Sequence, residues 1–328
     1  MNRSRFRRQR QRGVAVVTAL LLTTLAVTIV TSLFWQQQVQ VRSMENQRLQ
    51  LQTRWIVRGT LNFSRLVLFQ DFLNSGGVTR GNAAWATPVE ETRLDDYVER
   101  DRREGEDYNA TLSGRLVDAQ SRYNLTNLST ARVIDPDQQA VFARLLTNLQ
   151  LDAGLAQAVA KQVQSTQKVA APTTATGTAA TGKAAQSSGT EPLELVRVED
   201  LLAVSGFTPQ AVERLRDYVI ILPQPTLVNV NTASAQVLSA LSPSLPLADA
   251  AVLVNQVKQN RPFYSAQAYT NALAAVSATR VPQVTVDVKS SYFLAYTQVQ
   301  LDRASLASVS LLQRANNGLS TVIWIREN

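Results

Sequence analysis

Residues 1–34 read MNRSRFRRQRQRG followed by VAVVTALLLTTLAVTIVTSLF, and the junction between Gly13 and Val14 decides how the rest of the chain is placed. Six arginines precede Gly13, and the 21 residues from Val14 to Phe34 carry no charge. About 20 apolar residues in a helix span the hydrocarbon core of a bilayer. Arginines beside such a segment keep the short N-terminus on the cytoplasmic side. The sequence therefore predicts one transmembrane helix, with everything after Trp35 outside the cytoplasm.

Three interpretations compete for this junction. A secretory signal has an apolar stretch of roughly 7 to 15 residues and a small-x-small cleavage site, but this stretch is longer and Ser32–Gln38 offers no such site. A simple membrane anchor explains the apolar run and leaves Gly13 without a role. A basic leader that ends in Gly just before the apolar run resembles the substrate of a prepilin peptidase. That interpretation predicts cleavage between Gly13 and Val14.

Composition limits the size and the partners of the protein. The 328 residues are 45% apolar, which is enough for two compact units. The formal net charge is +8, but the leader at 1–13 holds six of the 33 basic residues and leaves 27 against 25 acidic ones. The basic balance is therefore mainly a signal of membrane topology, and it is no evidence for a nucleic-acid-binding face.

The chain contains no cysteine and no histidine. This excludes disulfides, thiolate nucleophiles, zinc fingers, histidine-containing triads and imidazole bases. Such a composition is compatible with an oxidising periplasm. Only carboxylates, lysines, hydroxyls and tyrosines remain for catalysis, so we predict that the protein is not an enzyme.

Helical character continues well beyond the apolar run. Gln36–Leu73 contains no proline and one glycine and is rich in Gln, Arg and Leu, which favour helices. Apolar residues recur with helical spacing along one side, at Val41, Met44, Leu51, Trp55, Phe63, Leu66 and Val67. Asn74–Gly77 is a stop signal. A single helix over Val14–Leu73 would be about 90 Å long, with half in lipid and half packed on a soluble domain.

Two polar stretches carry no clear secondary structure. Residues 79–107 are acidic with interleaved arginines, which indicates either a solvated loop or a site for a hard cation. For the second alternative the candidate calcium ligands are Asp95, Asp96, Glu99 and Asp101. Residues 166–191 are almost entirely Ala, Thr, Gly, Ser, Gln and Lys, so we expect a flexible surface loop there.

Strand patterns flank a helical region. Thr111–Val117 alternates in the manner of a strand, and Asp135 followed by Pro136 marks a helix start. Further helices are expected at Leu193–Val204 and from Pro209 to about Tyr218, before an apolar run at Val219–Leu222. Near the C-terminus four strands are predicted at Val284–Val288, Tyr292–Leu301, Ala304–Gln313 and Ser320–Ile325. Short turns between them favour an antiparallel meander with the long helix across one face.

One motif could indicate DNA binding. Val228–Leu241 resembles the start of a helix-hairpin-helix unit and Arg261–Ser265 its end, and such units hold phosphate on the backbone amides of a Gly-x-Gly hairpin. The hairpin position here, Leu241–Ala248, has prolines and no glycine, and the six basic residues of 193–280 are balanced by six acidic ones. A structural module is the favoured interpretation, in which Asn231 or Thr232 caps a helix that begins near Ala233.

Together, these segments resemble a known family. The Gly13 junction, Asp118–Leu128, Val228–Leu241, Arg261–Phe263, Asp287–Phe293 and Leu312–Arg314 occur in the order seen in K-type minor pseudopilins of bacterial type II secretion systems. The resemblance implies an α+β pseudopilin fold, a long N-terminal helix on an antiparallel sheet, interrupted by a large inserted helical domain. Since each group of strands is too small for an independent sheet, the strands before and after the insertion should pair.

The resemblance also implies boundaries for these parts. They are a leader at 1–13, a transmembrane part of the helix at 14–34, a first part of the pseudopilin domain at 35–125, an inserted helical domain at 126–280 and C-terminal strands at 281–328.

The resemblance further implies a function at the tip of the pseudopilus. The expected partners are the I-type and J-type minor pseudopilins, other pseudopilus subunits and the prepilin peptidase, which also methylates the new N-terminal amine, here that of Val14. The implied location is the inner membrane, crossed once, with the C-terminal domain in the periplasm. Calcium binding has family precedent, without ligands that transfer to particular residues. A DNA-uptake or competence role for the helix-hairpin-helix-like module is the alternative, and no nucleic acid is expected as a partner.

Thr18 departs from the general pilin pattern. Most pilin-like subunits have Glu at the fifth mature position, where it pairs with the N-terminal amine of a neighbour, and an unpaired charge at membrane depth is costly. The fifth residue after Gly13 is Thr18, as K-type members also lack this Glu. We therefore interpret Thr18 as a sign that the subunit sits at an end of the filament.

Overall fold

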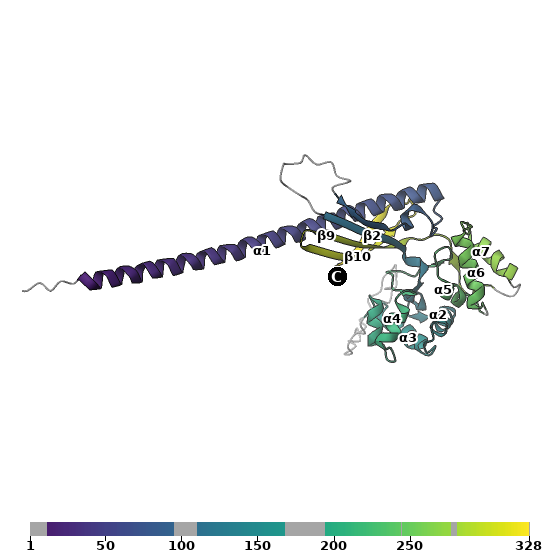
Figure 1. Cartoon of the computed structure of the whole chain (residues 1–328). Helices are drawn as coiled ribbons and strands as arrows, with labels where there is room; N and C mark the ends of the chain where they lie inside the picture. The colour runs from purple at the N-terminus through teal and green to yellow at the C-terminus, as the bar shows by residue number, and fades with distance from the viewer. Residues whose placement is uncertain (1–11, 95–109, 168–193, 244, 277–280, 328) are drawn as a thin grey trace, which may run out of the picture.

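A computed structural model of the chain describes residues 12–94, 110–167, 194–243, 245–276 and 281–327. The arginine-rich start, the candidate ligands Asp95, Asp96, Glu99 and Asp101 and nearly all of the loop at 166–191 lie outside these ranges. The described residues form a long helix, an antiparallel sheet beside its second half, and a helical module at one end of the sheet (Figure 1).

Helix α1 spans Arg12–Ser75 as one element of 64 residues, a length of about 96 Å at 1.5 Å per residue. Its first half projects away from the rest of the molecule (Figure 1). Its end follows the predicted stop signal, because Gly76 adopts a left-handed φ of 62° and the Gly77 amide donates to the Phe72 carbonyl at 3.2 Å. The continuous helix expected from the sequence is confirmed.

The sheet joins strands from both ends of the chain. Its order is β1-β2-β9-β10-β11, all antiparallel. The strands are β1 (Val89–Arg93), β2 (Ala110–Asp118), β9 (Tyr292–Leu301), β10 (Ala304–Arg314) and β11 (Ser320–Glu327). Strand β2 pairs with β9 from Ala110 opposite Leu301 to Asp118 opposite Phe293. The predicted pairing across the insertion and the α+β fold class are therefore confirmed.

Two strand predictions need correction. Strand β1 lies in the stretch expected to be a solvated loop. The pattern did not indicate it, because its sequence Val-Glu-Glu-Thr-Arg is mostly exposed at a sheet edge and has no apolar alternation. Val284–Val288 was expected in the meander, but only β8 (Val286–Asp287) forms there, parallel to β7 (Val228–Asn229). Val286 and Val288 are buried in the core of the helical module, which holds this segment away from the sheet.

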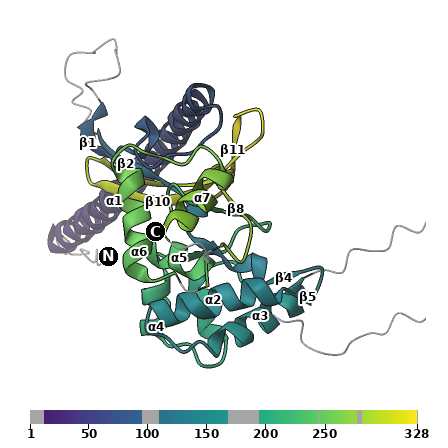
Figure 2. The ribbon, with the colours of Figure 1, turned by 90° about the vertical axis from the view of Figure 1, so that its right-hand side faces the viewer.

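The helical module contains six α-helices in the described ranges, which surround a common core (Figure 2). They are α2 (Pro136–Asn148), α3 (Leu155–Thr166), α4 (Pro209–Leu215), α5 (Ala235–Leu241), α6 (Leu247–Lys258) and α7 (Ala266–Val276). The module also contains the 3-10 helices η4 (Leu125–Leu128) and η5 (Val198–Ala203) and the short pairs β3 (Tyr123–Asn124) with β6 (Val219–Ile220) and β4 (Ser129–Thr130) with β5 (Val133–Ile134). Two more 3-10 turns, η1 (Ala84–Ala86) and η3 (Ala119–Ser121), precede β1 and follow β2.

Of two helix caps that the sequence predicts in the module, the structure confirms one and corrects the other. Asp135 caps α2 as predicted, since its carboxylate accepts from the amides of Asp137 and Gln138 at 2.9 and 3.1 Å. Helix α5 begins at Ala235 and its cap is Ser234, so the predicted cap at Asn231 or Thr232 was wrong. Within Leu193–Val204 the described helical turn is the 3-10 helix η5.

Three buried clusters hold these parts together. The first fills the helical module and includes Tyr123, Phe142 and Tyr269. The second lies between α1 and the sheet and contains Leu61 and Phe293 among its members. The third lies on the opposite face of the sheet, where Leu294 and Leu311 pack against Ile220 and Leu222 from the module. The sheet is thus covered by α1 on one face and partly by the helical module on the other.

Candidate assembly site

The first half of α1 is an exposed apolar helix. It is the helix among the described residues that is long and apolar enough to cross a membrane, with a mean hydropathy of 2.4 in its most apolar window. Thr18 lies on this half, and its hydroxyl donates to the carbonyls of Val14 and Ala15 at 3.1 and 3.0 Å. The other threonines of the segment bond to their own helix in the same way: Thr23, Thr24, Thr28 and Thr31. The threonine hydroxyls of this segment are therefore satisfied within the helix itself.

The second half of α1 has two apolar faces. One face packs on the sheet through Val57, Leu61 and Leu68, each at most 3% exposed. The other face carries large apolar side chains that are each more than half exposed: Met44, Leu51, Trp55, Phe63, Leu66 and Leu73. We call this second set the exposed stripe. Its members recur at spacings of seven, four, eight, three and seven residues, which keeps them on one side of a helix.

The exposed stripe corrects an expectation from the sequence. The apolar pattern at Met44, Leu51, Trp55, Phe63 and Leu66 was expected to mark the face that packs on the soluble domain. The structure buries the face opposite to it, so the pattern marks a surface that the described residues of this chain leave exposed. Of the predicted set, Val67 is the member that packs against the sheet cluster. A contiguous apolar face of this kind on a folded chain marks an interaction surface.

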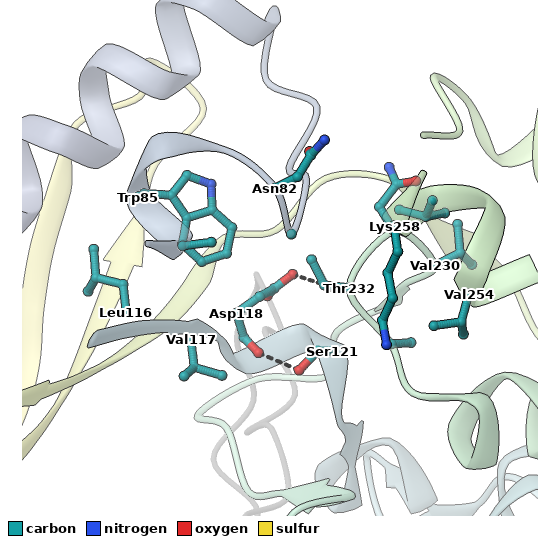
Figure 3. Close-up of a pocket in the computed structure, with 15 residues that line it drawn as sticks. Asn82, Trp85, Leu116, Val117, Asp118, Ser121, Val230, Thr232, Val254 and Lys258 are labelled. Atoms are coloured by element: carbon teal, nitrogen blue, oxygen red, sulfur yellow. Dashed lines mark hydrogen bonds between the residues drawn. The ribbon is translucent and has the colours of Figure 1, made fainter. Parts of the chain in front are cut away.

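A buried carboxylate connects the sheet with the helical module. Asp118 ends β2 and is 2% exposed. It accepts hydrogen bonds from the Gln120 amide at 2.8 Å, the Ser290 hydroxyl at 2.6 Å, the Thr232 hydroxyl at 2.6 Å and the Asn229 side-chain amide at 2.9 Å. Figure 3 shows the carboxylate directed at Thr232 across the junction. Burial raises the pKa of Asp118, and these hydrogen bonds oppose that effect.

A buried arginine extends this network to α1. Arg314, at the end of β10, donates to the Thr79 hydroxyl at 2.7 Å and to the Ser290 carbonyl at 2.9 Å. Its Nη1 lies 3.6 Å from Oδ2 of Asp71 on α1, an ion pair without a hydrogen bond. Burial lowers the pKa of Arg314 and raises that of Asp71, and each charge partly offsets the effect on the other. We call this set of groups the junction network: Asp71, Thr79, Asp118, Asn229, Thr232, Ser290 and Arg314.

The junction network lies beside a cleft of about 340 Å³ between the sheet and the module. Trp85 and Leu116 line one wall and Val254 and Lys258 the other (Figure 3). Trp85 also packs edge-on against Phe293, with ring centroids 5.3 Å apart. The titratable groups of its lining include the Asp118 carboxylate, which accepts four hydrogen bonds, and the Lys258 ammonium.

Sequence reasoning missed the junction network. Asp118, Asn229 and Ser290 all fall in segments that the sequence singled out, but single polar residues give no sign that they meet. Asn231, predicted as a helix cap, instead holds Phe263: its side-chain amide donates to the Phe263 carbonyl and its side-chain oxygen accepts from the Phe263 amide, both at 2.8 Å. These contacts join the two parts of the helix-hairpin-helix-like motif in the fold.

The sequence-predicted site residues are not brought together. Val14 and Thr18 lie near the start of α1, remote from the junction, and the candidate ligands Asp95, Asp96, Glu99 and Asp101 are outside the described residues. Among the residues that the structure does describe, there is no group of three or more Asp, Glu, His or Cys side chains suited to a metal ion.

A helix of membrane-spanning length that continues into a sheet-packing helix defines the class of pilin-like, membrane-anchored subunits, here with a helical module inserted between β2 and β9. Two family models with the description "Type II secretion system (T2SS), protein K" match residues 121–224 and 228–289, together about half of the chain. The chain belongs to the type II secretion system protein K family.

Relatives and a solved structure agree with this membership. Type II secretion system protein K of Pseudomonas aeruginosa is 28% identical over 95% of this chain and 91% of its own length. The proteins of the same name from Aeromonas hydrophila and Klebsiella pneumoniae are each 27% identical, over 94% and 95% of this chain and 95% of their own lengths. A chain in the crystal structure of the GspK-GspI-GspJ complex from enterotoxigenic Escherichia coli has the same fold, with a TM-score of 0.61, 17% identity and coverage of 88% of this chain and 99% of that one.

Proposed function

We propose that this chain is a minor pseudopilin at the tip of the type II secretion pseudopilus, where it starts assembly and supports export of folded proteins across the outer membrane. The observation that carries the proposal is the exposed stripe on α1, continuous with an apolar segment of membrane-spanning length. Helices with such a face associate side by side, because each covers the apolar surface of its neighbour. Family membership supplies the secretion system.

The expected partners are the I-type and J-type minor pseudopilins. The solved chain with the same fold comes from a GspK-GspI-GspJ complex, which supports such partners for this chain as well. The role is structural and not catalytic, and the chain crosses the bacterial inner membrane once with its C-terminal domains in the periplasm. The DNA-uptake alternative is not favoured, because the relatives are secretion proteins.

Maturation by a prepilin peptidase belongs to the same proposal. The enzyme would cut between Gly13 and Val14 and methylate the amine of Val14, which leaves α1 as both anchor and assembly surface. Thr18 would then be the fifth mature residue, without the carboxylate that pairs with a neighbour. A subunit without that carboxylate fits an end position in the filament.

Mass spectrometry after coexpression with a prepilin peptidase tests maturation. We expect a chain shortened by the 13 leader residues of this sequence, with N-methylated Val14 at its start. Coexpression with a catalytically inactive peptidase is the control and should leave the full-length chain. An unshortened chain with the active enzyme would contradict the pseudopilin proposal.

Copurification with I-type and J-type subunits tests assembly. The full chain should copurify with both, and the double variant Trp55→Glu/Leu66→Glu should lose most of this association, since it places two charges in the exposed stripe. Gln47→Glu, on the exposed surface of α1 but outside the stripe, is the control for added charge and should assemble normally. Equal recovery of partners by the double variant would refute a role for the stripe.

A further inference from the structure

A second cleft lies on the face of the sheet that α1 does not cover. It has a volume of about 390 Å³ and lies between β9, β10 and β11 on one side and η5 and β6 on the other. Four arginines and one carboxylate contribute to its lining: Arg122, Arg197, Arg216, Arg326 and Glu199. We call it the arginine cleft. Neither the apolar stripe nor the junction network extends into it.

Two of the four arginines are already matched by carboxylates. Arg216 pairs with Glu199 at 3.2 Å and with Glu213 at 3.3 Å. Arg122 lies 3.9 Å from Asp217, a longer contact. Neither Arg197 nor Arg326 forms an ion pair with a carboxylate in the described part of the chain. The cleft therefore presents two guanidinium groups whose charge is not directly paired.

Arg326 is held in position before any ligand arrives. Its guanidinium stacks on Trp324, with Cζ 3.9 Å from the ring centroid, and its Nη2 donates to the Val196 carbonyl at 3.1 Å. Burial lowers the pKa of Arg326, the nearby charge of Arg197 lowers it further, and Glu199 and Asp200 act in the opposite direction. Since Arg197 and Arg326 line the same cleft, a monoanion between their guanidinium groups would relieve the repulsion between the two charges. A preorganised guanidinium loses little entropy when it binds a carboxylate.

The floor of the cleft selects among anions. It is aliphatic and aromatic, with Val219, Ile221, Leu294 and Val309 beside Trp324. An apolar floor below a pair of arginines suits a carboxylate that adjoins an aliphatic side chain. A dianion such as phosphate gains nothing from the apolar floor and is repelled more strongly by Glu199. An acidic peptide combines the required charge and apolar surface in adjacent residues.

We propose that the arginine cleft binds an acidic peptide segment of a partner protein, with a Glu or Asp carboxylate held between Arg197 and Arg326 and an adjacent aliphatic side chain on the apolar floor. This binding does not depend on filament assembly, so the proposed function stands whether or not the peptide binds.

Fluorescence anisotropy on the full chain in detergent micelles tests this proposal. The probe is a labelled octapeptide, capped at both ends, in which Glu alternates with Leu. We expect binding at physiological salt and a loss of about tenfold in affinity for Arg197→Glu and for Arg326→Glu, because each removes a charge-assisted hydrogen bond. The same peptide with Gln in place of Glu should bind about tenfold more weakly.

Two controls keep the result interpretable. Arg48→Glu changes the same charge on the exposed surface of α1, outside the cleft, and should leave the affinity unchanged. Arg197 is exposed, so its variant should keep the wild-type circular dichroism spectrum and remains informative if Arg326→Glu unfolds. Unchanged affinity in Arg197→Glu would overturn the proposal. A competition experiment gives a second outcome that would overturn the proposal. If inorganic phosphate displaces the peptide at a concentration at which free glutamate does not, the cleft is a phosphate site.

Discussion

Asp118 illustrates how one buried side chain determines the position of segments that are distant in sequence. Its donors come from residue 120 beside it and from residues 229, 232 and 290 in the helical module. A buried carboxylate is tolerated when its oxygens are satisfied in this way. The network therefore links the end of β2 to the helical module through several hydrogen bonds to one side chain.

The first prediction concerns Asp118→Ala. Removal of the carboxylate leaves the buried donors of Ser290, Thr232 and Asn229 without their acceptor, so we expect a loss of about 3 kcal/mol in the free energy of unfolding. Chemical denaturation followed by circular dichroism measures it. Asp217→Ala is the matched control, since that side chain is 83% exposed, and it should change stability by less than about 0.5 kcal/mol. Equal effects in the two variants would show that the network is not a structural link.

The second prediction concerns Gly318 in the turn between β10 and β11. Its φ is 84°, and a Cβ there would lie 2.5 Å from the Phe72 ring on α1. Gly318→Ala should therefore destabilise the protein by about 2 kcal/mol through strain and steric overlap. Gly59→Ala is the opposite case, since a Cβ on this helical glycine meets nothing within 4 Å. Thermal denaturation should show Gly59→Ala stabilised by about 0.5 to 1 kcal/mol.

At the scale of elements, α1 has one apolar face that packs on the sheet and a second apolar face that is exposed. One face is buried on the sheet, with Leu61 and Leu68 at 2% and 0% exposure, and the other face is the exposed stripe. A helix that is apolar on both faces is expected where it lies between two partners. One partner is the sheet of the same chain, and under the proposed function the other is a neighbouring subunit.

The third prediction tests the link between α1 and β10. The Asp71–Arg314 pair is buried, with side chains 8% and 3% exposed, so removal of either charge leaves the other uncompensated. Asp71→Leu and Arg314→Leu should each cost about 3 kcal/mol or more in the free energy of unfolding. The double variant should cost less than the sum by at least about 1 kcal/mol. Additive costs in this double-mutant cycle would mean that the two charges do not stabilise each other.

At the scale of the whole molecule, a large helical module is inserted in the chain between two strands that pair in the sheet, β2 and β9. Asp118 and Phe293 are opposite partners in β2 and β9, so the helical module leaves and re-enters the sheet at neighbouring points. The first half of α1 extends beyond the other end of the sheet (Figure 1). This arrangement places the module at the far end from the apolar segment, which suits a subunit that ends a filament.

The fourth prediction tests that end position through Thr18. Thr18→Glu would supply the carboxylate that pilin-like subunits use to pair with a neighbour, so we expect altered initiation or length of pseudopili. Electron microscopy of pseudopili from cells that express the variant measures both. Thr18→Gln has the same size without the charge and should behave as wild type. Unaltered pili in Thr18→Glu would count against the argument that the missing carboxylate determines the end position.

The sequence by itself determined the elements that depend on local pattern. The uncharged run from Val14, the stop at Gly76, the cap at Asp135 and the strands that became β2, β9, β10 and β11 all follow from composition and period along the chain. Strand β1 escaped detection, because an exposed edge strand needs no apolar alternation. Pairing of β2 with β9 was predictable as well, since neither group of strands could form a sheet alone.

Only the tertiary structure decided which surfaces face each other. The period of Met44, Leu51, Trp55, Phe63 and Leu66 predicts a helix with an apolar side, but it does not say which partner covers that side. The structure assigns the sheet to the opposite face. In the same way, the meeting of Asp118 with Asn229 and Ser290 depends on contacts across more than a hundred residues. Local propensities carry no information on such contacts. The hydrogen bonds of Asp118 become strong only when the folded chain removes the carboxylate and its donors from water.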